Sequence, residues 1–255
     1  MKLPFFKSSK EEDRNILGID IGGSGIKGAI VDITTGELIT ERIRLETPQP
    51  ATPDAVVQTI HEMVNDFKWH GKIGCGFPAV IQKGIAKTAA NVDASWIGTN
   101  IESLITVTTG CITKVINDAD AAGLAEVKFG AGKEVDGVVL MLTIGTGIGS
   151  ALFIDGKLVP NTEFGHLYYK DMVAEKYCSD SARKKFELEW EVWAERFAKY
   201  LKHLERTVNP DLFIIGGGVS KKPEKFLPLI NITTPLSIAE QQNNAGIVGA
   251  ALAFS

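Results

Sequence analysis

The sequence predicts an α/β fold built from two similar halves, and two segments with the same plan carry that prediction. In each segment an apolar run is followed by a glycine-rich turn and a second apolar run, which is the pattern of a β-hairpin. The first segment is Leu17–Asp32 and the second is Val138–Gly156. An order of three strands, a helix and a strand begins at each hairpin, and this recurrence indicates a duplicated unit.

The elements of the first half follow from its apolar runs and helix boundaries. Thr52 and Pro53 suit the N-cap and the first position of a helix that runs to about residue 68. A second helix is expected at 102–108, and a third begins at residue 120 and ends near 129. Strands are expected at 16–20, 26–31, 38–45, 72–77 and 113–116.

The second half opens with its own three strands and then contains a long amphipathic segment. Apolar residues recur every three or four positions from Phe186 to Val208, which predicts one helix from about residue 179 to residue 208, ended by Asn209-Pro210. A buried strand is expected at 211–215, and a helix of small residues at 245–253.

Composition limits the class of protein. The chain has 255 residues, 44% of them apolar, and a formal charge of −4, which allows one large domain or two small ones and argues against bulk nucleic-acid binding. No stretch approaches the roughly 20 apolar residues of a membrane span, and the N-terminus lacks the apolar core of a signal peptide. The scattered cysteines, Cys75, Cys111 and Cys178, predict reduced thiols in a cytoplasmic protein.

The glycine turns are predicted to bind one polyanion from two sides. A turn without Cβ atoms lets backbone N–H groups approach an anion closely, and Ser24 and Thr146 add hydroxyl donors. Neither turn fits a dinucleotide-binding or Walker motif, because each leads into a strand. A third glycine loop, Gly216–Ser220, precedes Lys221 and Lys222. Charge runs are usually solvated surface, yet these lysines follow a loop that is expected to meet the polyanion.

Asp20 and Lys27 flank the first turn. A carboxylate beside a phosphate-binding turn requires a cation between them, and Mg²⁺ suits an oxygen-lined site of this kind. The alternative is that Asp20 belongs to an Asx-type turn and that Lys27 is only solvated.

The segment Asn117-Asp118-Ala119-Asp120 lies between a strand end and a helix start, where ligands of open α/β sheets gather. One aspartate can serve as the helix N-cap. Two aspartates and an asparagine exceed what a cap requires, so one aspartate is available as a base.

Glu163 and His166 are three residues apart in a loop that also contains a glycine. Both side chains can hydrogen-bond neighbouring hydroxyls of a polyol, although a lone histidine in a loop is usually structural. Spacing alone assigns nothing to Glu175.

Together these motifs resemble the ROK family of sugar kinases from Gly18 to Ala253, which is nearly the whole chain. The matching stretches are 18–27 and 142–149 for phosphate, 117–118 for the catalytic Asn-Asp pair, 163–166 for sugar, and 216–220 for the nucleotide side. Within the family, the amino-acid sequence is most similar to polyphosphate glucokinases in the stretches 74–80, 88–93, 95–99, 117–126 and 216–222.

The resemblance implies an actin-like (ribonuclease H-like) fold of duplicated βββαβ domains with a cleft between them. The expected domains are residues 1–117, joined by the C-terminal helix 245–255, and residues 118–244. Many family members carry a Cys-rich zinc motif after the sugar-binding histidine. Residues 168–177 lack that motif, so His166 is assigned to sugar rather than to zinc.

The resemblance also implies the roles of individual residues. Asp118 is the expected catalytic base, and Asp20 is expected to hold Mg²⁺ directly or through water. The expected sugar-binding residues are Asn91, Asn117, Asp118, Glu163, His166 and, by position alone, Glu175. The expected phosphate-binding residues are Asp20, Gly22, Gly23, Ser24, Gly25, Lys27, Thr143, Gly145, Thr146, Gly147, Gly217, Gly218, Ser220, Lys221 and Lys222.

The implied activity is a glucokinase that transfers a phosphoryl group from inorganic polyphosphate, with ATP as a second candidate donor, to the 6-hydroxyl of glucose. The expected cofactor is Mg²⁺, and the expected assembly is a cytoplasmic homodimer that binds neither nucleic acid nor membrane. One alternative is an ATP-dependent hexose or N-acetylhexosamine kinase of the same family. The other is an actin-like filament ATPase, which would have no use for polyol ligands.

Overall fold

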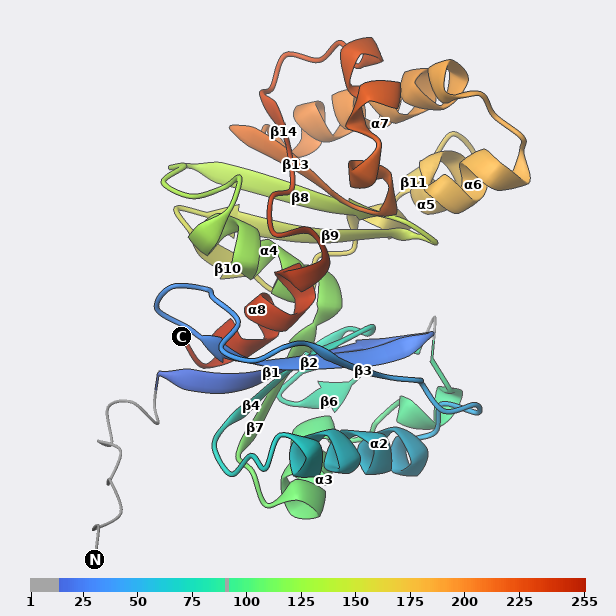
Figure 1. Cartoon of the computed structure of the whole chain (residues 1–255). Coiled ribbons are helices and arrows are strands. Elements are labelled where there is room, and N and C mark those ends of the chain that lie inside the picture. The colour runs from blue at the N-terminus through green and yellow to red at the C-terminus, as the bar shows by residue number, and fades with distance from the viewer. Residues whose placement is uncertain (1–13, 90–91) are drawn as a thin grey trace, which may run out of the picture. The chain divides into compact units, whose positions relative to one another are not determined.

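A computed structural model describes residues 14–89 and 92–255 (Figure 1). The chain folds into two compact units. The first comprises the described residues up to Ala122 together with Asn244–Ser255, and the second comprises Gly123–Asn243. The chain first passes from one unit to the other within helix α4 (Asp118–Phe129), between Ala122 and Gly123.

The first unit contains a five-stranded sheet in the order β3-β2-β1-β4-β7. β1, β2 and β3 are antiparallel neighbours, whereas β4 runs parallel to β1 and β7 runs parallel to β4. The strands are β1 (Asn15–Gly22), β2 (Gly25–Asp32), β3 (Ile43–Leu45), β4 (Ile73–Phe77) and β7 (Thr113–Asn117). A two-stranded ladder of β5 (Ile81–Gln82) and β6 (Ile85–Ala86) follows β4, and a short 3₁₀ turn, η1 (Ala94–Trp96), comes next.

The third strand is shorter than the prediction of 38–45, which was wrong for residues 38–42. Leu38 makes only an isolated bridge to Val31. The Thr40 hydroxyl then accepts the hydrogen bond of the Ile30 backbone N–H at 3.1 Å. Because a side chain takes the place of a backbone carbonyl there, the regular ladder begins only at Ile43.

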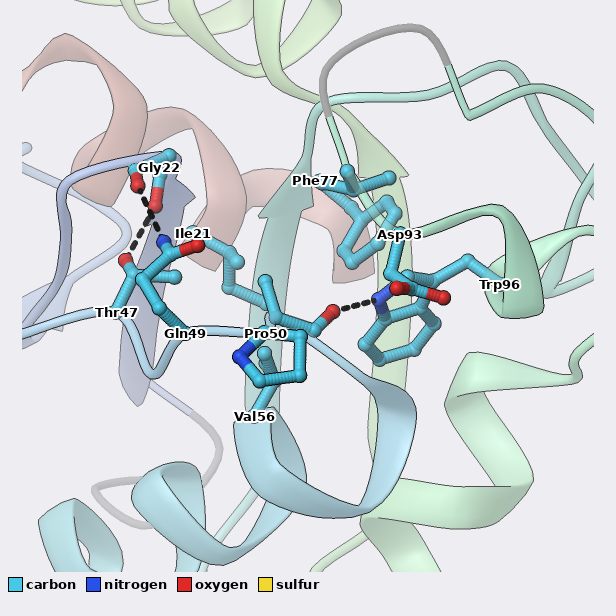
Figure 2. A pocket seen from close by; sticks show the side chains of 12 residues that line it. Ile21, Gly22, Thr47, Gln49, Pro50, Val56, Phe77, Asp93 and Trp96 are labelled. Carbon is cyan, nitrogen blue, oxygen red and sulfur yellow. Dashed lines mark hydrogen bonds between the residues drawn. The ribbon is translucent and has the colours of Figure 1, made fainter.

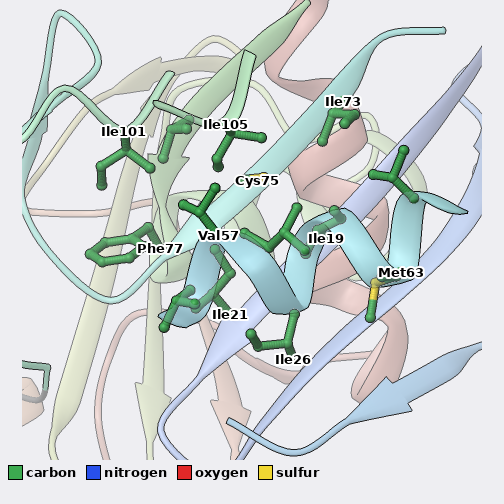
Figure 3. Close-up of a cluster of buried hydrophobic side chains, with 14 of the residues drawn as sticks. Ile19, Ile21, Ile26, Val57, Met63, Ile73, Cys75, Phe77, Ile101 and Ile105 are labelled. Atoms are coloured by element: carbon green, nitrogen blue, oxygen red, sulfur yellow. The ribbon is translucent and has the colours of Figure 1, made fainter. Parts of the chain in front are cut away.

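Helices cover both faces of this sheet (Figure 1). α2 (Pro53–Asp66) and α3 (Ile101–Thr109) lie on one face and bury apolar side chains of alternate strand residues, among them Ile19, Cys75 and Phe77 (Figure 3). The opposite face carries α8 (Ala245–Ala251), which is followed by a 3₁₀ turn, η7 (Leu252–Phe254).

The contact of α8 with the sheet requires glycine on the strands. A Cβ atom on Gly18 would lie 2.1 Å from the Ile247 carbonyl oxygen, and one on Gly74 would lie 1.9 Å from that of Ala250. The helix backbone therefore rests directly on β1 and β4, and these glycines serve packing rather than ligand binding.

The second unit repeats the sheet in the order β10-β9-β8-β13-β14. Its first three strands are antiparallel neighbours, β13 runs parallel to β8, and β14 runs parallel to β13. The same order and directions as in the first unit confirm the predicted duplication. The strands are β8 (Val138–Ile144), β9 (Ile148–Ile154), β10 (Lys157–Val159), β13 (Leu212–Gly217) and β14 (Leu236–Ile238).

The predicted single helix over 179–208 is wrong, because the segment forms two helices. α6 (Asp180–Lys185) begins at its N-cap Ser179 and ends at Phe186, and α7 (Trp190–Val208) begins after the break. Glu187 has a left-handed backbone with φ of 50°, and a helix cannot continue through such a residue. The apolar spacing continues across the break, so periodicity alone did not reveal it.

α7 packs its apolar face, including Trp193, Phe197 and Leu201, against the sheet of the second unit. The smaller elements of this unit are the 3₁₀ turns η2 (Phe164–His166), η3 (Gly218–Lys221), η4 (Pro223–Lys225) and η5 (Leu227–Leu229), the hairpin β11 (Tyr168–Tyr169) with β12 (Met172–Val173), and helix α5 (Ala174–Cys178). The chain returns to the first unit within the 3₁₀ turn η6 (Gln242–Asn244). In the described part of the chain, no helix combines the length and the apolar character needed to cross a membrane.

Candidate active site

The first glycine turn is held by side chains from the edge strand β3 and from the residues that directly follow it in the chain. The Thr47 hydroxyl donates to the Gly22 carbonyl at 2.5 Å, as Figure 2 shows, and the Gln49 amide donates to the Gly23 carbonyl at 3.4 Å. The Arg44 guanidinium donates to the Ser24 carbonyl at 2.9 Å. Three successive carbonyl groups are thus engaged by residues 44–49, which fixes the turn.

Neither Gly23 nor Gly145 is required by the packing of its own turn. A Cβ atom at either position would meet no heavy atom within 4 Å, and neither residue has a positive φ. The open space leaves the backbone of both turns accessible to a ligand, as an anion-binding turn needs.

A cavity of about 280 Å³ lies beside the first turn, in the first unit (Figure 2). Its walls are mainly apolar, and the Trp96 indole N–H donates to the Ala51 carbonyl at 2.8 Å. The lining residues are Ile21, Gly22, Gly23, Thr47, Gln49, Pro50, Ala51, Val56, Phe77, Val92, Asp93 and Trp96. Asn91, an expected sugar ligand, lies outside the described residues.

Asp20 and Lys27 are directly opposite each other on β1 and β2. The Lys27 Nζ lies 3.2 Å from Asp20 Oδ2, so the carboxylate is in an ion pair. Gly246 gives this carboxylate room, because a Cβ atom there would lie 2.8 Å from Asp20 Cγ.

Asn117 caps α4. Its buried Oδ1 accepts hydrogen bonds from the backbone N–H groups of Ala119 at 2.8 Å and Asp120 at 3.1 Å. The Ala119 N–H is shared, because Asp118 Oδ1 also accepts from it at 2.9 Å. The helix therefore begins at Asp118, two residues before the predicted start. The Asn117 amide also donates to the Ala79 carbonyl at 3.1 Å, which ties the loop after β4 to the helix N-terminus.

The first unit places Asp118 on the same face of the sheet as Asp20 and Lys27. Gly76 is opposite Asp20 in the parallel ladder. A Cβ atom on Gly76 would lie 3.7 Å from the Asp118 Cα. The predicted base, metal ligand and phosphate-binding lysine are therefore neighbours across β4, β1 and β2.

The second unit brings Glu163, His166 and Glu175 together. His166 Nδ1 lies 3.2 Å from Glu163 Oε2, and its Nε2 lies 3.9 Å from Glu175 Oε1. Burial raises the pKa of the Glu163 carboxyl above its ordinary value, the His166 imidazole opposes that rise, and the Glu175 carboxylate adds to it. An imidazole with two carboxylates offers both hydrogen-bond donors and acceptors, which is the combination that a polyol can use.

Glu175 also lies against the second glycine turn, a position that sequence spacing did not reveal. A Cβ atom on Gly147 would lie 2.4 Å from Glu175 Oε2. The loop that carries Glu163 is fixed by the Ser150 hydroxyl, which accepts from the Phe164 N–H at 3.0 Å, and by the Tyr200 hydroxyl, which donates to the Phe164 carbonyl at 2.6 Å.

The third glycine loop packs beside the strand that enters the second turn. Gly217 has φ of 78°, and a Cβ atom there would lie 2.5 Å from the Ile144 carbonyl oxygen. The Ser220 hydroxyl donates back to the Gly217 carbonyl at 2.8 Å, and Lys221 and Lys222 are exposed. Of the other predicted phosphate ligands, Thr143 lies near the end of β8, Thr146 lies in the second turn and Gly218 begins η3.

Comparison with known proteins identifies the family. Residues 16–183 match the ROK family. The chain belongs to the ROK family. Its two repeated sheets are those of the actin-like fold of that family, so the predicted family and fold are confirmed.

Relatives in this family are similar over nearly the whole chain. The polyphosphate glucokinase of Mycobacterium tuberculosis (strain CDC 1551 / Oshkosh) is 52% identical over 241 residues, which cover 94% of this chain and 91% of that protein. The crystal structure of an inorganic polyphosphate/ATP-glucomannokinase from Arthrobacter sp. strain KM has a TM-score of 0.89 at 47% identity, and the match covers 93% of this chain and 97% of that one. A ROK family glucokinase from Streptomyces griseus in complex with glucose and AMPPNP has a TM-score of 0.78 at 25% identity, with 93% and 98% covered.

Proposed function

We propose that the protein is a glucokinase that transfers a phosphoryl group from inorganic polyphosphate to the 6-hydroxyl of glucose. The observation that carries this proposal is the 52% identity to a polyphosphate glucokinase over 94% of the chain. The relatives are sugar kinases, which argues against the alternative that the protein is an actin-like filament ATPase.

In the proposed reaction, Asp118 accepts the proton of the 6-hydroxyl as that oxygen attacks the terminal phosphorus of the donor. The bond from this phosphorus to its bridging oxygen breaks, and the polyphosphate, shorter by one phosphate, leaves with the negative charge on that oxygen. Phosphoryl transfer depends mainly on positioning and on neutralising charge. Asn117 supports the base, because its cap and its bond to Ala79 fix the first turn of α4. Glu163, His166 and Glu175 bind glucose hydroxyls, as does Asn91, which lies outside the described residues.

The glycine turns bind the donor through their backbone N–H groups, with the hydroxyls of Ser24 and Thr146 as further donors. Lys27, Lys221 and Lys222 add positive charge, and Lys221 and Lys222 are exposed where a long polyanion can reach them. A polyanion is attracted by the charge of these lysines and a neutral sugar is not, so their charge favours a polyanionic donor.

Asp20 is the proposed ligand of Mg²⁺, and the residues present fit this ion. Mg²⁺ in phosphate sites is commonly held by one or two carboxylates together with substrate phosphates and waters. Asp20 supplies one carboxylate beside the first turn, and Gly246 leaves it space. When bound, the ion neutralises charge on the donor phosphates. We expect Asp20→Ala to raise the Mg²⁺ concentration needed for turnover, and full activity in excess chelator would contradict the proposal.

The donor is tested by comparing glucose phosphorylation from polyphosphate and from ATP with the purified protein. We expect higher kcat/KM with polyphosphate, and we expect its KM to rise with ionic strength more steeply than the KM of glucose, because salt screens charge contacts. Phosphorylation from ATP but not from polyphosphate would make the protein an ATP-dependent hexose or N-acetylhexosamine kinase instead. Because the Arthrobacter protein is a polyphosphate/ATP enzyme, ATP is the second donor to compare.

We further propose a cytoplasmic homodimer. All three cysteines are free and buried, which suits a reducing compartment. The dimer is inferred from the family resemblance, and a light-scattering mass of one chain would contradict it.

A further inference from the structure

Arg44 lies beside the first glycine turn, in a place where the turn makes room for it. Its Nη2 donates to the Ser24 carbonyl at 2.9 Å. A Cβ atom on Gly25 would lie 2.6 Å from Arg44 Nε and 3.0 Å from its Cζ. The glycine therefore lets the guanidinium lie directly against the turn.

Arg44 also continues the row of residues that the proposed mechanism uses. Gly76 is opposite Asp20, Asp20 is opposite Lys27, and Lys27 is opposite Arg44. Directly opposed residues of neighbouring strands project to the same face of a sheet. Arg44 thus shares the face of Asp20 and Lys27 and ends the row at the edge strand β3, about two strand spacings, or roughly 10 Å, from Asp20.

Arg44 differs from Lys27 because its positive charge has no carboxylate partner among the described residues. Lys27 is paired with Asp20 at 3.2 Å. Within residues 14–89 and 92–255, no carboxylate forms an ion pair with Arg44, and its side chain is exposed. A guanidinium has five N–H donors, and the bond to Ser24 uses one of them.

We propose that Arg44 is a donor-binding residue, whose guanidinium is fixed by the Ser24 carbonyl and binds a phosphate group of the donor outside the one transferred. The proposal rests on the proposed polyphosphate-dependent activity. A planar guanidinium matches the oxygens of a phosphate better than an ammonium does, and its bonds to phosphate are charge-assisted. A polyphosphate chain carries phosphates beyond the reacting one, so it can reach a cation at the edge of the sheet.

Arg44 can instead act only as a support for the turn, like Thr47 and Gln49, and two variants separate these roles. Arg44→Gln removes the charge and keeps an N–H donor. Thr47→Val removes the 2.5 Å hydrogen bond to Gly22 without any change of charge. Arg206→Gln is the matched control, because it removes the same charge from an exposed position in the last turn of α7.

We expect Arg44→Gln to raise the KM of polyphosphate about tenfold or more, as the loss of a charge-assisted hydrogen bond does. We also expect a shallower dependence of log KM on log salt concentration, weaker direct binding of polyphosphate in titrations without glucose, and an unchanged KM of glucose. Arg44→Lys should recover part of the loss. Arg206→Gln should match the unmodified protein, and Thr47→Val should leave the salt dependence unchanged.

An unchanged salt dependence and unchanged polyphosphate binding in Arg44→Gln would overturn the role of Arg44, provided that the unmodified protein uses polyphosphate. Equal losses in Arg44→Gln and Thr47→Val, both without a change in salt dependence, would overturn it as well and leave only a support of the turn. Failure of the unmodified protein to use polyphosphate would instead reject the proposed function, so the two failures are distinguishable.

Discussion

Replacement of Asp118 by asparagine is expected to lower kcat for glucose phosphorylation by about 10²–10⁴-fold, which is the usual contribution of general acid–base catalysis. The substitution keeps the size of the side chain and removes its ability to take a proton. Asp118 is the first residue of α4, and the cap by Asn117 fixes the backbone on which it stands. The helix should therefore form as before, and the loss should fall on turnover rather than on folding.

The measurement is kcat with saturating glucose and donor, together with the shift in melting temperature that glucose produces. A retained shift shows that the variant still binds glucose, since a ligand stabilises the state that binds it. Asp54→Asn is the matched control, because Asp54 is an exposed aspartate in the first turn of α2 and no role in the reaction is proposed for it. Turnover of Asp118→Asn within a few-fold of the unmodified protein would reject Asp118 as the base.

The fold was predictable because its signals are local. Apolar runs and glycine turns lie within each hairpin, and the same pattern occurs twice, so the repeated sheets followed from sequence. Helix boundaries were less predictable. The predicted start of α4 was two residues late, because Asn117 is the cap. The break before α7 depends on the left-handed backbone of Glu187 and the extended backbone of Glu189, which the apolar spacing does not indicate.

The candidate site was predictable where one segment contains both the glycine turn and its polar residues. The supporting residues were not, because their contacts join distant segments. Arg44 and Gln49 donate hydrogen bonds to carbonyls 20 and 26 residues away. The amino-acid sequence of residues 44–49 contains no motif that indicates these contacts. The glycines themselves look alike in the sequence, yet Gly18 serves helix packing while Gly23 leaves open space. Only the neighbouring backbone distinguishes these two roles.

Glu126 is the clearest residue that sequence reasoning overlooked. It lies on α4 in the second unit and is 0% exposed. Its Oε2 accepts hydrogen bonds from the N–H groups of Ala131 and Glu240, each at 3.0 Å, and its Oε1 accepts from Gln241 at 2.7 Å. Glu240 and Gln241 lie more than a hundred residues further along the chain, so one carboxylate joins the end of α4 to the segment after β14.

Replacement of Glu126 by alanine is expected to lower the free energy of unfolding by about 3 kcal/mol or more, because three backbone N–H groups lose their buried carboxylate acceptor and a hydrogen bond to a charged group contributes roughly 1.5–3 kcal/mol. Thermal and urea unfolding measure the loss, and hydrogen exchange at the amides of Ala131, Glu240 and Gln241 should accelerate. Glu126→Gln keeps one acceptor oxygen and should lie between the alanine variant and the unmodified protein. Glu191→Ala, at an exposed position of α7, is the control and should change stability by no more than about 0.5 kcal/mol. If Glu126→Ala unfolds at the same temperature and urea concentration as this control, and if the three amides stay protected from hydrogen exchange, the carboxylate does not hold the two segments together.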